Sequence, residues 1–277
     1  MVTPDDIADH DAERRAEQIS RAWARRTRQL CLAGFGREPD VAFTSEEYGP
    51  RYARFLGARQ VSVDPGRVRV PISGTAVRAD PWAAWDQLHP CVRAWYTIRV
   101  CVVGAESTGT TTLARGLAAH YDCDWVPEYG RTFCEERLAV GQNIDWRTED
   151  FIHIARRQQA DEDAAARGGG RLLICDTDAL ATSIWHQRYL GTGSAVVAAI
   201  AAGRRYALYL LTGDDIPFVQ DGTRDGEHLR DWMTQRFREE LTARALPWVE
   251  VTGSRAQRLA AATTHVDALL AAGPTGR

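Results

Sequence analysis

The spacing of apolar positions changes in a regular way along residues 98–277. Short apolar runs typical of buried strands occupy 98–103, 172–175, 206–211 and 248–251. The segments between them, rich in Ala or amphipathic, predict helices at 113–119, 132–140, 149–167, 179–189, 195–202, 227–244 and 255–272. Strands separated by helices predict an α/β fold with a parallel sheet covered on both faces, which binds its ligands beyond the carboxyl ends of the strands.

The first 97 residues carry a shorter pattern. Its predicted elements are an exposed Arg-rich helix followed by a strand, a helix and a strand, at 11–30, 41–44, 46–57 and 61–64. The arginines of the first segment favour a solvated helix face over a binding site. We therefore expect two domains, with residues 1–97 in the first and residues 98–277 in the second.

A glycine-containing segment follows the first strand of the second domain. It reads Gly104-Ala-Glu-Ser-Thr-Gly-Thr-Thr-Thr112 and fits the G-x-x-x-x-G frame of a phosphate-binding loop between a strand and a helix. Backbone N–H groups of such a loop, together with the helix N-terminus, attract phosphate. The predicted ATP-binding residues are Gly104, Glu106, Ser107, Thr108, Gly109, Thr110, Thr111 and Thr112. The alternative is a glycine turn that binds no nucleotide.

Two positions of this loop decide its chemistry. Thr111 stands where a phosphate-binding loop carries the hydroxyl that binds Mg²⁺, whereas Thr110 stands where such a loop carries its lysine. The sequence contains no lysine at all, so every basic side chain is an arginine. Thr110 can offer a hydrogen bond but no charge. Any side-chain cation that serves the phosphates must therefore be an arginine of this chain or of a partner.

Composition narrows the classes of protein. The 277 residues are 44% hydrophobic and 26% charged, with a formal net charge of −3, which is ordinary for a globular protein and predicts no general nucleic-acid binding. The sequence predicts neither a membrane helix nor a signal peptide, and its six cysteines are scattered without a C-x-x-C motif. We expect a cytoplasmic protein with reduced thiols. The sequence leaves its oligomeric state open, with a homo-oligomer among the options.

Polar side chains follow two of the predicted strands. Asp176 and Asp178 come after strand 172–175, where a carboxylate can hold Mg²⁺, as we expect of Asp176, or accept a proton from an attacking hydroxyl. The alternative for either aspartate is a helix cap. Glu128, Tyr129 and Arg131 follow another strand end, so that Glu128 could bond to substrate hydroxyls and Tyr129 could stack on a flat ring. The alternative for this group is a surface turn with an ion pair.

A polar loop at 213–226 has the composition of a mobile lid. Arg224 lies between Gly222 and Gly226 and could close on the phosphates while water is expelled. Because the phosphate-binding loop lacks lysine, Arg224 is the leading candidate for the missing charge, and Arg131 is the second. The alternative for Arg224 is an exposed loop residue.

The motifs together resemble one family. Phe43-Thr-Ser-Glu-Glu-Tyr-Gly and Ile72-Ser-Gly-Thr-Ala-Val-Arg are similar to the C-terminal half of a nucleotidylyltransferase domain. The phosphate-binding loop, Glu128-Tyr-Gly-Arg, Asp176-Thr-Asp and Asp221-Gly-Thr-Arg resemble the kinase domain of NadR-type proteins. These proteins join a nicotinamide mononucleotide (NMN) adenylyltransferase to a ribosylnicotinamide kinase, and the resemblance covers nearly the whole chain.

The resemblance implies a function for each domain. The kinase of this family transfers the γ-phosphate of ATP, with Mg²⁺, to the 5′-hydroxyl of nicotinamide riboside. In the first domain the resemblance assigns ATP phosphates to Ser73, Thr75 and Arg78. The H-x-G-H element of adenylyltransferases does not occur in the sequence, so we expect no adenylyltransferase activity from this chain. The alternatives are a regulatory protein that binds ATP or a pyridine nucleotide with little turnover, and a kinase for another nucleoside or small metabolite.

Overall fold

The computed structural model describes residues 4–139, 141, 145–220 and 226–274, and it divides into two compact units. The units are Met1–Arg78 and Ala79–Arg277. We predicted the domain boundary at 97/98, and the assignment of the two domains stays a prediction. Residues 79–97 pack with the second unit, where the Arg171 guanidinium donates to the Trp82 carbonyl oxygen (2.8 Å) and the Thr97 hydroxyl to that of Gly170 (3.2 Å).

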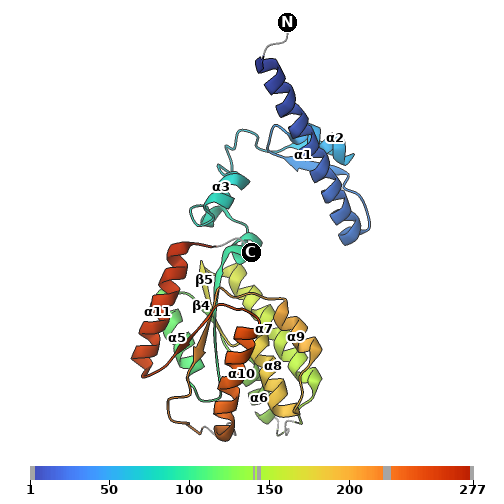
Figure 1. Cartoon of the computed structure of the whole chain (residues 1–277). Helices are drawn as coiled ribbons and strands as arrows, with labels where there is room; N and C mark the ends of the chain where they lie inside the picture. The colour runs from blue at the N-terminus through green and yellow to red at the C-terminus, as the bar shows by residue number, and fades with distance from the viewer. Residues whose placement is uncertain (1–3, 140, 142–144, 221–225, 275–277) are drawn as a thin grey trace. The chain divides into compact units, whose positions relative to one another are not determined.

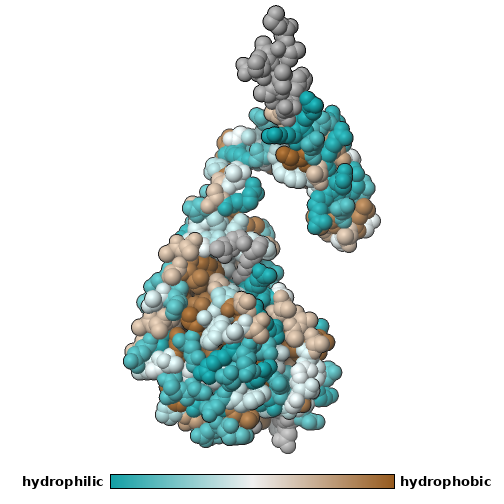
Figure 2. All heavy atoms as spheres, in the orientation of Figure 1, coloured by the Kyte–Doolittle hydropathy of each residue, from teal (hydrophilic) through white to brown (hydrophobic). Residues whose placement is uncertain are grey.

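The first unit is a small parallel α/β arrangement. Its elements are α1 (Pro4–Phe35), β1 (Val41–Thr44), α2 (Gly49–Leu56), β2 (Arg59–Ser62) and α3 (Gly74–Ala79). β1 and β2 pair in parallel. The buried core of this unit consists of three alanines and one leucine: Ala24, Ala42, Ala53 and Leu56. The described surface of α1 and α2 is largely hydrophilic, as the Arg-rich sequence predicts (Figure 2).

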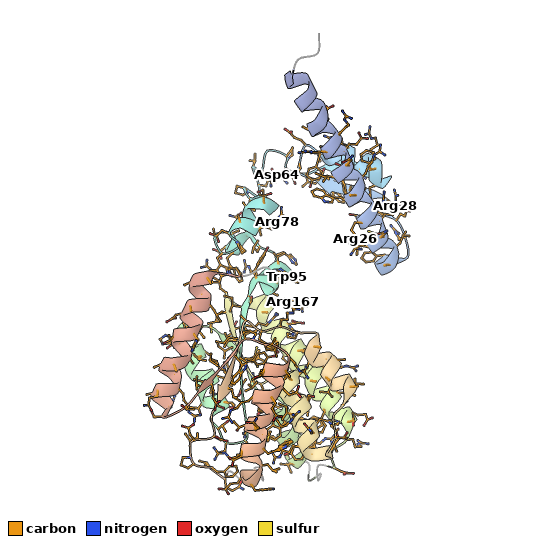
Figure 3. The ribbon with its side chains drawn as sticks, in the orientation of Figure 1. Arg26, Arg28, Asp64, Arg78, Trp95 and Arg167 are labelled. Atoms are coloured by element: carbon orange, nitrogen blue, oxygen red, sulfur yellow. The ribbon has the colours of Figure 1, made fainter. Side chains whose placement is uncertain are left out.

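Arg28 of α1 makes hydrogen bonds to α2. Arg28 donates from Nη2 to the carbonyl oxygens of Phe55 (3.2 Å) and Leu56 (2.8 Å) at the C-terminal end of α2. Those carbonyls belong to the last turn of a helix, where they lack intrahelical partners. Arg28 therefore joins α1 to α2, while Arg26 on the same helix is exposed (Figure 3).

The second unit alternates strands and helices as the sequence predicts. Its elements are η1 (Trp85–Gln87), α4 (Pro90–Tyr96), β3 (Ile98–Gly104), α5 (Thr110–Tyr121), β4 (Asp124–Val126), α6 (Tyr129–Ala139), α7 (Thr148–Gly168), β5 (Leu172–Asp176), α8 (Ala179–Leu190), α9 (Ala195–Ala202), β6 (Leu208–Thr212), η2 (Glu227–Leu229), α10 (Arg230–Ala243), β7 (Trp248–Val251) and α11 (Arg255–Ala272). The short helix α4 was not predicted.

The five strands of this unit form one parallel sheet in the order β4-β5-β3-β6-β7. From β3 the chain builds first toward one edge and then toward the other, so a crevice forms at the carboxyl end of β3 where the direction reverses. The phosphate-binding loop begins at this point. Sequence and topology therefore agree on where a ligand binds.

Helices cover both faces of the sheet (Figure 1). Alternate residues of β3 show the two layers: Val100 and Val102 pack with α5 and α11, and Cys101 and Val103 pack with α7, α8 and α10. This confirms the predicted fold class, an α/β protein with a parallel sheet. Within the described part of the chain, every helix is too short or too polar to span a lipid bilayer.

Candidate active site

The phosphate-binding loop has the backbone shape that its sequence predicts. It joins the end of β3 to the start of α5, and it turns through positive φ at Ser107 (60°) and Gly109 (86°). A Cβ at Gly104 would collide with the Thr212 hydroxyl of β6. Glycine is therefore required at 104 by close packing and favoured at 109 by left-handed backbone geometry.

The loop is fixed from its inner side by buried polar contacts. The Thr108 hydroxyl donates to the Ala105 carbonyl oxygen (2.7 Å) and shares a hydrogen bond with the Thr212 hydroxyl (2.7 Å). Arg258 of α11 donates to the Thr108 carbonyl oxygen (2.6 Å) and pairs with Asp215. Sequence reasoning missed Arg258 because it lies 150 residues from its partner. Thr108 thus acts on the shape of the loop through contacts made inside the protein.

A cavity of about 190 Å³ opens over the loop. Its walls come from the loop, from α6 and α7, from α8 and from the segment before α7: Val103, Gly104, Ala105, Glu106, Ser107, Gly109, Thr110, Thr111, Thr112, Glu128, Gly130, Arg131, Cys134, Glu135, Trp146, Phe151, Ile154, Thr177, Thr182, Trp185 and Tyr189. The structure therefore gathers most of the predicted ATP-binding residues, together with Glu128 and Arg131, around one space.

Asp176 ends β5 beside the loop and is 1% exposed. Burial raises the pKa of its carboxyl group to about 6, while hydrogen bonds from the Thr111 and Thr110 hydroxyls and the charge of Arg131 act in the opposite direction. Among the described residues, Oδ1 of Asp176 has no hydrogen-bond partner. A buried carboxylate oxygen without a donor, next to the Thr111 hydroxyl, suits a hard divalent cation.

Asp178 faces a different neighbourhood. Its Oδ1 accepts from the Ala181 backbone N–H (2.9 Å), which makes it the N-cap of α8, and its Oδ2 accepts from the Tyr209 hydroxyl (2.8 Å). Both oxygens thus serve the fold, as in the helix-cap alternative. The residue between the two aspartates, Thr177, has a φ of 76°, a strained value for a β-branched residue, and lines the cavity.

The Glu128–Arg131 segment divides its side chains between the cavity and the outer surface. Glu128 and Arg131 line the cavity. The Tyr129 hydroxyl instead bonds to His153 Nε2 (3.1 Å), and Arg157 lies over its ring at 5.3 Å. The structure therefore engages Tyr129 with α7, and three other aromatic residues, Trp146, Trp185 and Tyr189, line the cavity.

Those aromatic residues form a stacked wall of the cavity. Trp146 and Tyr189 stack with ring centroids 4.9 Å apart at 27°, and Trp185 and Tyr189 stack at 6.0 Å and 19°. All three line the cavity. Sequence reasoning missed them because Trp146 precedes α7 whereas Trp185 and Tyr189 lie on α8. The i, i+4 spacing of Trp185 and Tyr189 was a signal that they share a helix face.

The loop after β6 touches the phosphate-binding loop. The Val219 backbone N–H donates to the Ser107 hydroxyl (2.9 Å), and that of Gly226 donates to Glu106 Oε2 (2.7 Å). Arg224 lies outside the described residues. These contacts bring Val219 and Gly226 to the phosphate-binding loop, and the lid role of the 213–226 loop stays a prediction.

A second, smaller cavity of about 110 Å³ adjoins the phosphate-binding loop and shares Gly109 and Thr112 with the first. Its other residues come from α5, α11 and the loops that follow β6 and β7: Thr108, Leu113, Gly116, Ile216, Gly253, Arg255, Arg258 and Leu259. The apolar members Leu113, Ile216 and Leu259 give this space walls suited to a flat, uncharged ring.

In the first unit, the predicted phosphate site is an exposed helix end. The Ser73 hydroxyl accepts from the Ala76 backbone N–H (3.0 Å), and Arg78 donates to the Thr75 hydroxyl (3.3 Å). Arg78 is labelled on α3 in Figure 3. Ser73 therefore acts as an ordinary helix cap, and Thr75 and Arg78 bond to each other within the same short helix.

Comparison with known proteins places this site in a family. Residues 99–258 match the model of an AAA domain family. The chain belongs to this AAA domain family. It is 31% identical over 194 residues to the trifunctional NAD biosynthesis/regulator protein NadR of Escherichia coli (strain K12), a match that covers 70% of this chain and 47% of that protein. The NadR of Salmonella typhimurium is 30% identical with the same coverage.

Solved structures agree with these matches. A NadR protein in complex with NR has a TM-score of 0.63 at 20% identity, covering 90% of this chain and 74% of that one. A NadR protein in complex with NAD and AMP-PNP has a TM-score of 0.60 at 19% identity, covering 90% and 72%. The chain spans about half the length of the curated relatives it matches. The resemblance to NadR-type proteins is confirmed, and the second unit has an α/β P-loop fold.

Proposed function

We propose that this chain transfers the γ-phosphate of ATP to the 5′-hydroxyl of nicotinamide riboside and forms NMN. The observation that carries the proposal is Asp176, a buried carboxylate beside a phosphate-binding loop and an aromatic cavity, with one oxygen that accepts no hydrogen bond from the residues that the structure describes. The resemblance to NadR names the substrate, and the cavity supplies a reason for it. The pyridinium ring of nicotinamide riboside is flat and cationic, and it would be attracted to the faces of Trp146, Trp185 and Tyr189.

The phosphate-binding loop and the two cavities also offer positions for ATP and Mg²⁺. The triphosphate would bind along Gly104–Thr112, and the adenine ring would enter the second cavity between Leu113, Ile216 and Leu259. Mg²⁺ would be held by the Thr111 hydroxyl and Asp176, and when bound it neutralises charge on the phosphates. A single carboxylate and a hydroxyl suffice because Mg²⁺ takes its other ligands from phosphates and water.

In the transfer step, the riboside 5′-oxygen forms a bond to the γ-phosphorus and the bond to the β-phosphate oxygen breaks, which leaves ADP. The hydroxyl proton passes to a carboxylate. Glu128 is the preferred acceptor because it lines the cavity, whereas Asp178 is not among the lining residues and caps α8. Arg131 on the cavity wall and Arg224 on the lid remain our predicted phosphate ligands.

The proposal is tested by an ADP-release assay with ATP, Mg²⁺ and nicotinamide riboside, in which mass spectrometry identifies the product. We expect NMN and ADP in equal amounts, with no ADP when the riboside is omitted. Adenosine, cytidine and uridine serve as matched acceptors that lack the cationic ring. ADP release that occurs only with one of these would replace nicotinamide riboside by another acceptor.

The second candidate is a regulatory protein that binds ATP or a pyridine nucleotide with little turnover. Thr110 at the lysine position favours it, because a phosphate-binding loop without its lysine loses a charge that serves the transferred phosphate. Calorimetry separates the two candidates. Tight ATP binding with no NMN formed at any riboside concentration would select the regulatory protein. We further propose that the chain has no adenylyltransferase activity.

A further inference from the structure

The phosphate-binding loop places no cation of its own against the triphosphate, because Thr110 replaces the lysine and the chain contains no lysine elsewhere. We propose that Arg188 of α8 is the fixed cation that binds the transferred γ-phosphate in this protein. The inference rests on the proposed function of the site and names a residue of its machinery that the sequence motifs did not include.

Arg188 reaches the phosphate-binding loop from α8, beside residues that line the cavity. Its Nη2 lies 3.4 Å from Oε2 of Glu106, the third residue of the loop. The guanidinium carbon lies 4.8 Å from the ring centroids of both Trp185 and Tyr189. The arginine thus contacts three residues that line the cavity, Glu106, Trp185 and Tyr189, on the side where an ATP γ-phosphate and a riboside hydroxyl would meet.

Burial makes this charge effective. The Arg188 side chain is 3% exposed and that of Glu106 is 11% exposed. A cation held in a site from which water is excluded attracts phosphate far more strongly than one in bulk solvent, and it needs no reorganisation when the reaction occurs. Arg131, by contrast, is classed as exposed on the cavity rim, where water screens its charge.

The helix that carries Arg188 is rigid at both ends. Asp178 caps its start and is itself held by the Tyr209 hydroxyl, and Gly191 ends it in a left-handed conformation. The same Asp178 that fails as a proton acceptor therefore positions the arginine three turns away. A side chain on a fixed helix suits the recognition of one phosphate better than a side chain on a lid.

Glu106 is one partner of this arginine, whose Nη1 also lies 3.9 Å from Met233 Sδ. It accepts from Arg188 and from the Gly226 backbone N–H (2.7 Å) of the lid, so one carboxylate joins the arginine, the loop and the lid. A guanidinium carries five N–H donors in a fork and can bridge a carboxylate and a phosphate oxygen at once, which an ammonium group does less well. Arginine at 188 therefore keeps the Glu106 contact while it engages the γ-phosphate.

The role of Arg188 is to stabilise the negative charge that develops on the γ-phosphoryl group during transfer. As the bond between the γ-phosphorus and the β-phosphate oxygen breaks, negative charge spreads over the γ-phosphoryl oxygens, and the bond to the riboside oxygen forms while its proton leaves to a carboxylate. Arg188 donates hydrogen bonds to those oxygens and takes no part in the proton transfer. Arginine contacts of this kind raise phosphoryl-transfer rates by about 1000-fold or more.

The test compares Arg188→Gln with a double variant. We expect Arg188→Gln to lower kcat by about 100-fold or more, and Thr110→Lys in the Arg188→Gln background to recover at least about 10-fold, because it restores a cation to the same phosphate. Arg157→Gln is the matched control, since Arg157 is an exposed arginine of α7 paired with Asp161. A purely structural role for Arg188 predicts no rescue by a lysine at 110.

Two outcomes overturn the inference: a kcat within about 3-fold of wild type in Arg188→Gln, or a loss of kcat that Thr110→Lys leaves unchanged. If Arg188→Gln misfolds by circular dichroism, Arg188→Met keeps the length and the apolar packing against Trp185 and Tyr189, and takes its place in both comparisons.

The role of Arg188 can be tested even if the proposed kinase function fails. If the wild type forms no NMN, calorimetry with ATP and ADP still tests the arginine, because it would bind the phosphate that only ATP carries. Arg188→Gln should then weaken ATP binding by about 10-fold more than ADP binding. Equal losses for the two nucleotides would overturn the inference.

Discussion

Both units of this chain pair parallel strands with helices, but the sheet of the second unit is larger and is covered on both faces. In the described residues, the first unit pairs two parallel strands over a core of Ala24, Ala42, Ala53 and Leu56, whereas the second pairs five strands between two helical layers. Each carries a segment whose sequence resembles a phosphate site. In the first unit that segment is an exposed helix end bonded to itself, and in the second it is a loop fixed by buried contacts.

The difference shows what a phosphate motif requires from the fold around it. Thr108 is 0% exposed because β3, β6 and α11 surround it, and the loop keeps its shape through those contacts. Thr75, on a six-residue helix, meets only its own neighbour Arg78 among the described contacts. A Ser, Thr and Arg in the right order thus remain a cap unless a sheet and a second helix position them. Five variants test this comparison.

The largest expected effect is on the second unit at Asp176. Asp176→Asn keeps the size of the side chain and removes its charge, so it should lower NMN formation by about 1000-fold while ATP binding without Mg²⁺ changes little. The measurement is the rate of NMN formation across a Mg²⁺ titration. Asp161→Asn on the exposed face of α7 is the control. Turnover within about 10-fold of wild type would remove Asp176 from the metal site.

The next effect concerns the two cores. Leu210→Ala deletes a side chain that is 0% exposed in β6, the strand between β3 and β7, and should cost the second unit about 2–5 kcal/mol. Leu56→Ala in the smaller core should lower the stability of the first unit and leave ATP binding intact. Urea unfolding followed in parallel with ATP binding checks both. Loss of ATP binding in Leu56→Ala would show that the units depend on each other.

A third effect is the pH dependence that Asp176 gives to stability. Because burial raises its pKa from 3.8 to about 6, the folded state holds the proton more tightly than the unfolded state. This contribution to stability is present below about pH 4 and is lost as pH rises through about 6, a loss of about 3 kcal/mol. Wild type measured without Mg²⁺ should therefore lose stability relative to Asp176→Asn across this range. Parallel pH profiles of the two would contradict a raised pKa.

A smaller effect is expected at the aromatic wall. Trp146→Leu keeps an apolar side chain but removes the ring face, so the KM for nicotinamide riboside should rise about 10-fold with kcat nearly unchanged. Trp23→Leu in the first unit, where the tryptophan is 53% exposed, should leave both constants unchanged. A loss confined to kcat would place the aromatic wall near the transferred phosphate and away from the nicotinamide ring.

The smallest expected effect is at the phosphate motif of the first unit. Arg78→Ala should leave the kinase rate within about 2-fold of wild type, and wild type given ATP and NMN should release no pyrophosphate. Both are measured with purified protein. Pyrophosphate release that depended on NMN and fell in Arg78→Ala would make this motif a working site, and the contrast between the two units would disappear.

Much of the second unit could be predicted because its elements are encoded locally. Short apolar runs predicted the strands, and the Ala-rich segment 255–272 predicted α11 with its observed bounds. The position of the phosphate-binding loop followed from its glycines and the strand before it. Asp176 followed from the rule that ligands meet the carboxyl ends of parallel strands, which holds whatever the strand order.

What the sequence alone determined is therefore the order of the elements, the place of the loop and the absence of lysine from it. Only the tertiary structure decided which carboxylate is buried without a donor, that Tyr129 packs on His153, and that Trp146, Trp185 and Tyr189 form one wall. It also brought Arg188 to Glu106, 82 residues away along the chain. Such contacts depend on how helices pack across a sheet, and the local spacing of residues does not predict that packing.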